Sequence, residues 1–142
     1  TGSAATSQKL KSHRAIAREG VRFIAEQDSL NASVLGHDAA PETPEFDLFV
    51  KEVIREMTAK AGQKCTAIRR ALVPESMMDA VENALKARLA NIHPGDPREE
   101  STKLGALVSQ AQRDDVRSKV ADLAREAKIA FGDPEASPVH AR

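Results

Sequence analysis

The sequence contains no tryptophan and no tyrosine, and only four of its 142 residues are phenylalanine. Leucine, valine, isoleucine and phenylalanine together supply 30 residues, whereas alanine alone supplies 24. Because large aromatic side chains bury the most area per residue, their scarcity predicts a small hydrophobic core. A single domain is the ordinary expectation for this length, but so thin a core favours part of a domain over a complete one.

A surplus of charge and a long apolar run are also absent. Lysine and arginine number 21, as do aspartate and glutamate, which excludes a nucleic-acid-binding arm or an acidic tail as the main theme. No apolar run approaches the ~20 residues that span a bilayer, and the N-terminus lacks the basic-then-apolar order of a signal peptide. The sequence therefore predicts a cytoplasmic protein with neither nucleic acid nor membrane as a partner.

Cysteine and histidine are scarce as well. Cys65 is the only cysteine, so an intrachain disulfide is excluded. The four histidines are widely spaced along the chain, and neither a zinc-ligand spacing nor a helical His-Glu-x-x-His pattern is present. The sequence therefore predicts no metal site.

Apolar residues recur every three or four positions in three segments, a spacing typical of amphipathic helices. These segments run from Thr43 or Pro44 to the stop at Gly62, over 77–92, and over 110–127. Short apolar or β-branched runs predict strands over 21–25, 32–35 and 66–73, and a capped helix is expected around 8–11. Strands that alternate with helices indicate an α/β fold with parallel pairing.

Three places could carry chemistry. Cys65 follows Gly62-Gln63-Lys64 in a turn between a helix and a strand, where it is either a small buried hydrophobe or a nucleophile. Glu26 stands at the end of the expected strand 21–25, where a carboxylate either lines a ligand crevice or is simply solvated. Gly2-Ser3 either presents backbone N–H groups to a phosphate or forms a plain capped loop. Each residue taken alone leaves both readings open.

The order of these motifs resembles that of the NAD(P)-dependent aldehyde dehydrogenase family. Thr1-Gly2-Ser3 stands where that family has its cofactor turn, Glu26 stands for its general base, and Cys65 stands for its nucleophile. Gly95-Asp96-Pro97 and the segment 105–109 echo later family motifs. The resemblance extends to about Ala127 and implies a partial aldehyde dehydrogenase catalytic domain, with 1–131 as its central part and 132–142 as a loop or disordered tail.

The resemblance also implies a chemistry. Cys65 would attack a small-molecule aldehyde, hydride would pass to NADP or NAD, and Glu26 would activate the water that releases the acid. Gly2, Ser3 and Gln27 would lie at the cofactor. The parent enzyme would be a homo-oligomer. Because other family segments that build the cofactor pocket have no counterpart here, the 142-residue chain by itself is expected to be inactive.

The residues after Glu26 depart from the commonest family pattern. They read Gln27-Asp28-Ser29-Leu30-Asn31, where the family usually has Leu-Gly-Gly-Lys. This resembles the subgroup that oxidises CoA-linked semialdehydes in the aerobic breakdown of phenylacetate and benzoate. Two alternatives remain: a CoA-acylating aldehyde dehydrogenase, in which CoA replaces water, and a non-enzymatic helical interaction module with an incidental cysteine.

Overall fold

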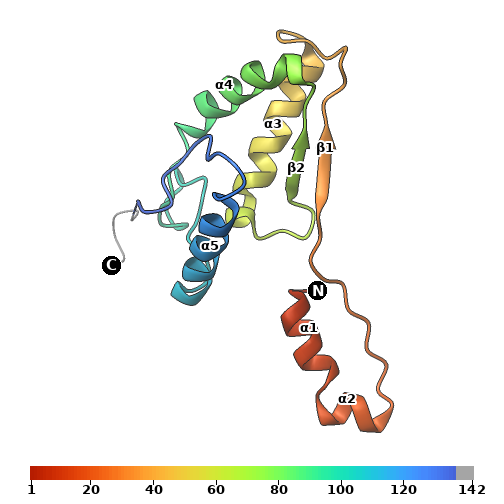
Figure 1. The fold of residues 1–142 in the computed structure, drawn as a ribbon. Coiled ribbons are helices and arrows are strands. Elements are labelled where there is room, and N and C mark those ends of the chain that lie inside the picture. Colours follow the sequence, from red (N-terminus) through yellow and green to blue (C-terminus); the bar gives the residue numbers. More distant parts are fainter. Residues whose placement is uncertain (137–142) are drawn as a thin grey trace.

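The structure, a computed structural model, describes residues 1–136, so that positions 137–142 of the expected tail lie outside the described residues. Two strands, β1 (Asn31–Val34) and β2 (Ile68–Leu72), pair in parallel, and a helix crosses over between them (Figure 1). The helices are α1 (Ala4–Lys11), α2 (Arg14–Glu19), α3 (Pro44–Thr58), α4 (Met78–Leu89) and α5 (Gln110–Leu123), with short 3₁₀ turns at Ala59–Gly62 and Glu75–Met77. The predicted α/β class with parallel strands is confirmed.

Helix α3 is the centre of the fold, and its sequence explains why. The Thr43 hydroxyl accepts a hydrogen bond from the Phe46 N–H at 3.3 Å, and Pro44 begins the helix. The acidic residues in its first turn interact favourably with the positive end of the helix dipole. Five of its apolar residues fall on one face and are buried, namely Phe46, Phe49, Val50, Val53 and Ile54, whereas Leu48 and Met57 are exposed. The helix therefore forms from both local capping and burial of this face.

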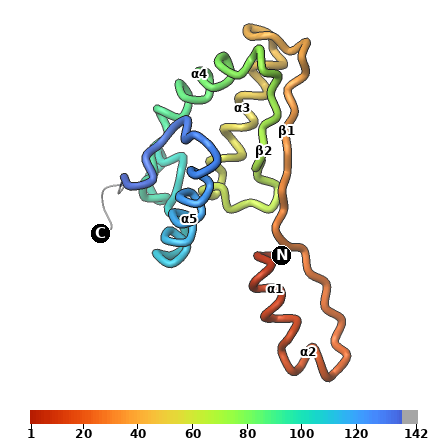
Figure 2. The backbone as a smooth tube through the Cα atoms, viewed as in Figure 1, coloured from red at the N-terminus to blue at the C-terminus, as the bar shows by residue number. Residues whose placement is uncertain are grey.

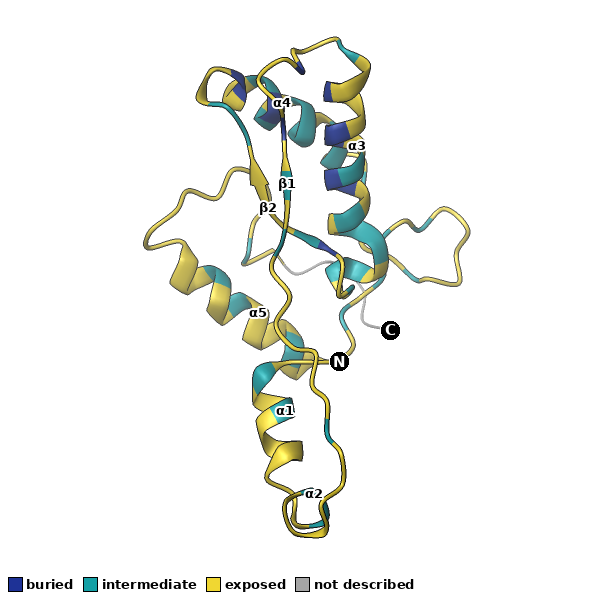
Figure 3. Cartoon of the chain, turned by 90° about the vertical axis from the view of Figure 1, so that its right-hand side faces the viewer, coloured by how far each residue is buried: buried dark blue, intermediate teal, exposed yellow. Residues whose placement is uncertain are grey.

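The core is as small as the composition predicts. Leu35, Ala39, Met77 and Val81 join the buried face of α3, and Figure 3 shows the buried positions gathered around α3, α4 and the strands. The accessible area is 11,166 Å², whereas a monomer of this mass is expected to expose about 7,100 Å². Much apolar surface therefore lies open, including Val108 at 81% exposure.

The segment before β1 forms an arm that projects from this core, with α1 and α2 on one side and an extended connection on the other (Figures 1 and 2). The prediction of a strand over 21–25 is wrong. A strand requires a hydrogen-bonded neighbour along its length, but this connection pairs only at its end, through an isolated bridge between Gly2 and Gln27. Ile24 is 83% exposed, so burial does not stabilise a strand here either.

The Gly62 position gives a stability prediction. Its φ is +73°, and a Cβ there would lie 3.3 Å from the Met57 carbonyl oxygen. Because an L-residue in the left-handed region is strained, we expect Gly62→Ala to lower the free energy of unfolding by about 1–2 kcal/mol. Urea denaturation of the intact protein, by which we mean the parent chain that contains these 142 residues, measures this loss. Gly105→Ala is the control, because a Cβ at Gly105 meets nothing within 4 Å. Equal losses in the two variants would contradict the explanation.

Candidate active site

Cys65 is exposed in a loop between α3 and β2, which we call the cysteine loop and define as residues 63–67. The chain enters it through three consecutive residues with positive φ: Lys60 at 52°, Ala61 at 53° and Gly62 at 73°. The two non-glycine residues cost about 1–2 kcal/mol each in this region. Such strain persists only where the surrounding structure holds it, and it is frequent at active sites. The exposed thiol does not fit the reading of Cys65 as a buried hydrophobe.

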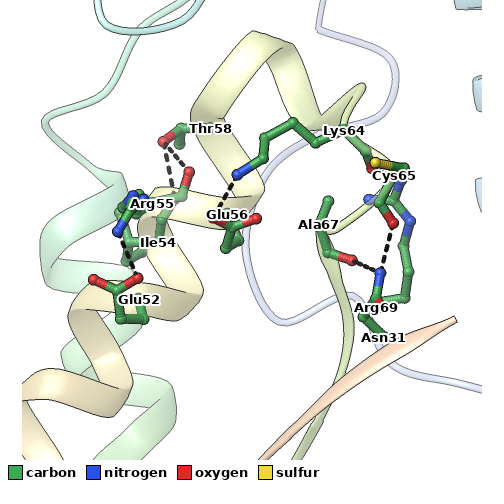
Figure 4. Close-up of polar contacts among 10 residues, drawn as sticks. All are labelled: Asn31, Glu52, Ile54, Arg55, Glu56, Thr58, Lys64, Cys65, Ala67 and Arg69. Atoms are coloured by element: carbon green, nitrogen blue, oxygen red, sulfur yellow. Dashed lines mark hydrogen bonds and ion pairs between the residues drawn. The ribbon is translucent and has the colours of Figure 1, made fainter. Parts of the chain in front are cut away.

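The backbone of the cysteine loop is held by side chains from the segment after Glu26. The Ser29 hydroxyl donates to the Cys65 carbonyl oxygen at 2.5 Å, and the Asn31 amide donates to the same oxygen at 2.7 Å. Asn31 also donates to the Ala67 carbonyl oxygen at 3.3 Å (Figure 4). These contacts bring together two segments that are more than 30 residues apart in the chain.

An ion pair ties the same loop to α3. The Lys64 ammonium lies 2.7 Å from Glu56 Oε1, and the Glu56 side chain is only 12% exposed. Figure 4 shows the Lys64 side chain reaching toward α3, away from the Cys65 sulfur. On the other side, the Arg69 guanidinium donates to the Lys64 carbonyl oxygen at 3.3 Å. The residue before the thiol is therefore anchored through both its side chain and its backbone.

Glu26 is exposed and is held by the first residues of the chain. The Thr1 hydroxyl donates to Glu26 Oε2 at 3.1 Å, and the Gly2 N–H donates to the Glu26 carbonyl oxygen at 3.0 Å. Since Gly2 also pairs with Gln27, the structure brings Gly2, Glu26 and Gln27 together. The N–H of Gly2 is thus already committed within the protein.

Ser3 caps the N-terminus of α1, and its hydroxyl accepts a hydrogen bond from the Thr6 N–H. The Ala4 N–H, in the first turn of the same helix, donates to Asp28 Oδ1 at 3.0 Å. A cavity of about 210 Å³ lies between α1 and the extended connection, and its lining includes Lys11, Phe23 and Gln27. The lining combines a lysine ammonium and two glutamine amides with an aromatic ring, whereas the N–H of Ala4 is already bound to Asp28. Of the three residues predicted to lie at the cofactor, Gln27 lines this cavity, whereas Gly2 and Ser3 do not.

The segment 93–105 forms a loop whose two ends are hydrogen-bonded to each other, and it contains the Gly95-Asp96-Pro97 motif. The Gly95 N–H donates to the Leu104 carbonyl oxygen at 2.9 Å. The Arg98 guanidinium hydrogen-bonds to Asp96, and this contact lowers the pKa of the Asp96 carboxyl below its ordinary value. Asp96 therefore stabilises this turn in its charged form.

Sequence reasoning missed Ser29, Asn31 and Asp28 as site residues. The available signal was local: these three polar residues follow Glu26 within five positions, and small polar side chains of this kind often bind nearby backbone groups. Asp28 adopts a φ of 48°, a conformation in which aspartate is tolerated better than most residues. The partners of Ser29 and Asn31, however, lie too far along the chain to be inferred from spacing.

The fold and this site define an α/β domain with an exposed, anchored cysteine. The profile of the aldehyde dehydrogenase family matches residues 1–140, and the chain belongs to that family. It is 46% identical to the 3,4-dehydroadipyl-CoA semialdehyde dehydrogenase of Aromatoleum evansii, over 99% of this chain and 28% of that protein. It is 39% identical to a putative aldehyde dehydrogenase of Staphylococcus haemolyticus, over 62% of this chain and 20% of that one. The chain thus spans between a fifth and just over a quarter of these relatives.

Solved structures agree with the family. A betaine aldehyde dehydrogenase from Staphylococcus aureus, in complex with NAD+, matches 92% of this chain and 25% of its own with a TM-score of 0.79 and 27% identity. A succinate-semialdehyde dehydrogenase from Burkholderia pseudomallei matches 89% of this chain and 25% of its own with a TM-score of 0.72 and 26% identity. The expectation of a partial aldehyde dehydrogenase domain is therefore confirmed.

Within residues 1–136, every helix is too short or too polar to cross a membrane.

Proposed function

We propose that the protein oxidises an aldehyde to a carboxylic acid with NAD+ or NADP+, and that Cys65 is the nucleophile. The observation that carries this proposal is the exposed thiol in a loop bound to the segment of Glu26. Family membership adds weight to this reading over a helical interaction module. The inactivity expected of the 142 residues alone stays a prediction.

The chain's residues suggest the following order of events. The Cys65 thiolate attacks the aldehyde carbon and forms a thiohemiacetal, whose oxyanion the Cys65 N–H would stabilise. The bound nicotinamide supplies the hydride acceptor for this reaction. The acyl group is left on Cys65 as a thioester, which must be released before the next turnover.

Glu26 is proposed as the general base of that release. An exposed carboxylate held by Thr1 and Gly2 can take a proton from water while the water attacks the thioester. Release to water gives an acid, whereas release to free CoA gives an acyl-CoA. Glu26 therefore favours the acid-forming reaction over the CoA-acylating alternative.

The cofactor contacts within this chain are proposed to come from Ser3 and Gln27, with Gly2 ordering the turn between them. Ser3 lies at the start of α1 and Gln27 lines the adjacent cavity, so both can orient a phosphate-bearing group beside Glu26. NAD+ is bound in the structure of the S. aureus relative, whereas the resemblance to the CoA-semialdehyde subgroup favours NADP+ as the cofactor.

The proposed substrate is a CoA-linked semialdehyde from aromatic-acid degradation, with phenylacetate or benzoate as the source compound. Its support is the identity of 46% to a dehydroadipyl-CoA semialdehyde dehydrogenase, over nearly the whole chain, together with the departure from Leu-Gly-Gly-Lys after Glu26. We further propose that the parent enzyme is cytoplasmic and forms a homo-oligomer.

The test is aldehyde-dependent reduction of NAD+ and NADP+ by the intact protein. CoA-linked semialdehydes, the same semialdehydes without CoA, and simple aldehydes such as propanal are compared at equal concentration. We expect the CoA-linked compounds to give the highest kcat/KM and free CoA to leave the product an acid. Equal kcat/KM for all three classes would contradict the substrate, and acyl-CoA as product would contradict the role of Glu26.

A further inference from the structure

Several hydrogen bonds hold the backbone of the cysteine loop. Two peptide planes flank the Cys65 Cα, and each has its carbonyl oxygen fixed. The Lys64 carbonyl accepts from the Ala67 N–H at 3.2 Å and from Arg69 at 3.3 Å. The Cys65 carbonyl accepts from Ser29 and Asn31, so both of its lone pairs are used. Fixing both planes fixes the direction of the Cys65 Cα–Cβ bond and leaves one rotatable bond to the sulfur.

The β-sheet supports the same arrangement. Asn31 pairs with Ile68 while Ala32 pairs with Arg70, so Arg69 is an extra residue on β2. Irregularities of this kind re-aim side chains and are frequent beside active sites. Here the extra residue is the one whose side chain binds the Lys64 carbonyl. Asn31, at the first position of β1, spans the loop from Cys65 to Ala67 with its two amide hydrogens.

We infer that Ser29 and Asn31 are positioning residues that aim the Cys65 thiol at the aldehyde and hold it in register with Glu26. The inference rests on the proposed function for its kinetic consequence. Both residues follow Glu26 within five positions, so the base and the donors that fix the nucleophile belong to one segment. Movement of this segment would shift base and nucleophile together, which preserves their relative geometry through the two chemical steps.

Kinetics of the intact protein test this inference. A nucleophile displaced by about 1 Å loses up to about 100-fold in rate while substrate contacts elsewhere are kept. We therefore expect Ser29→Ala to lower kcat about tenfold and Asn31→Asp about 100-fold, with KM changed less than twofold. Asn31→Asp keeps the size of the side chain but opposes two carbonyl oxygens with a carboxylate. Ser29→Thr keeps the hydroxyl and should restore most of kcat.

Ser33→Ala is the matched control, because Ser33 lies on β1 and its hydroxyl makes no side-chain hydrogen bond among the described residues. An equal fall of kcat in Ser33→Ala and Ser29→Ala, or a rise in KM with kcat unchanged, overturns the positioning role. So does the failure of Ser29→Thr to restore activity when Ser29→Ala lacks it.

Hydrogen exchange of the intact protein gives a readout that does not depend on turnover. Ser29→Ala and Asn31→Asp should speed amide exchange in the cysteine loop at least threefold, with β2 beyond Arg70 unchanged. If the wild-type protein oxidises no aldehyde, the proposed function fails, and the exchange rates still decide whether the two side chains hold the loop. Unchanged exchange in both variants would overturn the inference even in an active enzyme.

Discussion

Replacing Cys65 with alanine should abolish aldehyde-dependent reduction of NAD(P)+ by the intact protein. The thiol is exposed in a loop that side chains hold from both sides, and without it no covalent intermediate can form. Removal of a nucleophile lowers kcat by about 10⁴-fold or more. The measurement is absorbance of the reduced cofactor at saturating aldehyde, with initial rates compared at equal protein concentration.

Two controls distinguish lost chemistry from lost structure. Since the Cys65 side chain is exposed, Cys65→Ala should leave the urea midpoint of unfolding unchanged. Thr66→Ala alters the neighbouring exposed side chain of the same loop and should keep kcat within about threefold of wild type. Substantial activity in Cys65→Ala, or equal losses in both variants, would remove Cys65 from the nucleophile's role.

Replacing Glu26 with glutamine should separate the two chemical steps. Hydride transfer needs the thiol but not the base of deacylation, so a first turnover should still give about one reduced cofactor per site. Steady-state turnover should then fall by about 10²–10⁴-fold, the range that general-base catalysis contributes. Rapid-mixing absorbance measures the burst and the later linear rate in one experiment.

Glu19→Gln provides the matched control, because Glu19 is also an exposed glutamate and lies at the end of α2. It should leave both the burst and the linear rate unchanged. A Glu26→Gln protein with normal turnover would show that another group activates the water. A protein without a burst would place Glu26 before hydride transfer instead.

Helices and strands that combine periodic burial with a clear cap or breaker could be predicted from the sequence. Thr43, Pro44 and the apolar face of α3 act over one or two turns, so their effect can be read locally. The expected helix around 8–11 also forms, with Ser3 as its cap. Helix α5 ends at Leu123 and not at 127 as predicted, because residues 124–127 form turns.

The prediction of a strand over 21–25 is wrong because the preference of its residues for β-structure does not supply a neighbouring strand to pair with. Val21 and Ile24 suit a strand, but they are 53% and 83% exposed and stand opposite no other strand within residues 1–136. The predictions of strands at β1 and β2 are confirmed because these two strands pair with each other, with α3 as the connection between them along the chain. Pairing over distance is therefore the information that composition and periodicity lack.

The same limit applies to the site. Cys65 and Glu26 could be singled out from the residues and their order along the chain, and their catalytic roles stay predictions. The contacts from Ser29 and Asn31 to the Cys65 carbonyl depend on how α3 and β2 return the chain to β1, and the ion pair of Lys64 with Glu56 depends on the turn that follows α3. Only three-dimensional structure could identify them.

The central claim is that an acyl group is carried on Cys65 and released with the help of Glu26. The most direct measurement is peptide mass spectrometry of the intact Glu26→Gln protein after rapid mixing with a CoA-linked semialdehyde and NADP+, followed by acid quenching. The account predicts that the peptide containing Cys65 gains the mass of the substrate's acyl group, in about one copy per chain. An unmodified Cys65 peptide, with reduced cofactor already formed, would contradict it.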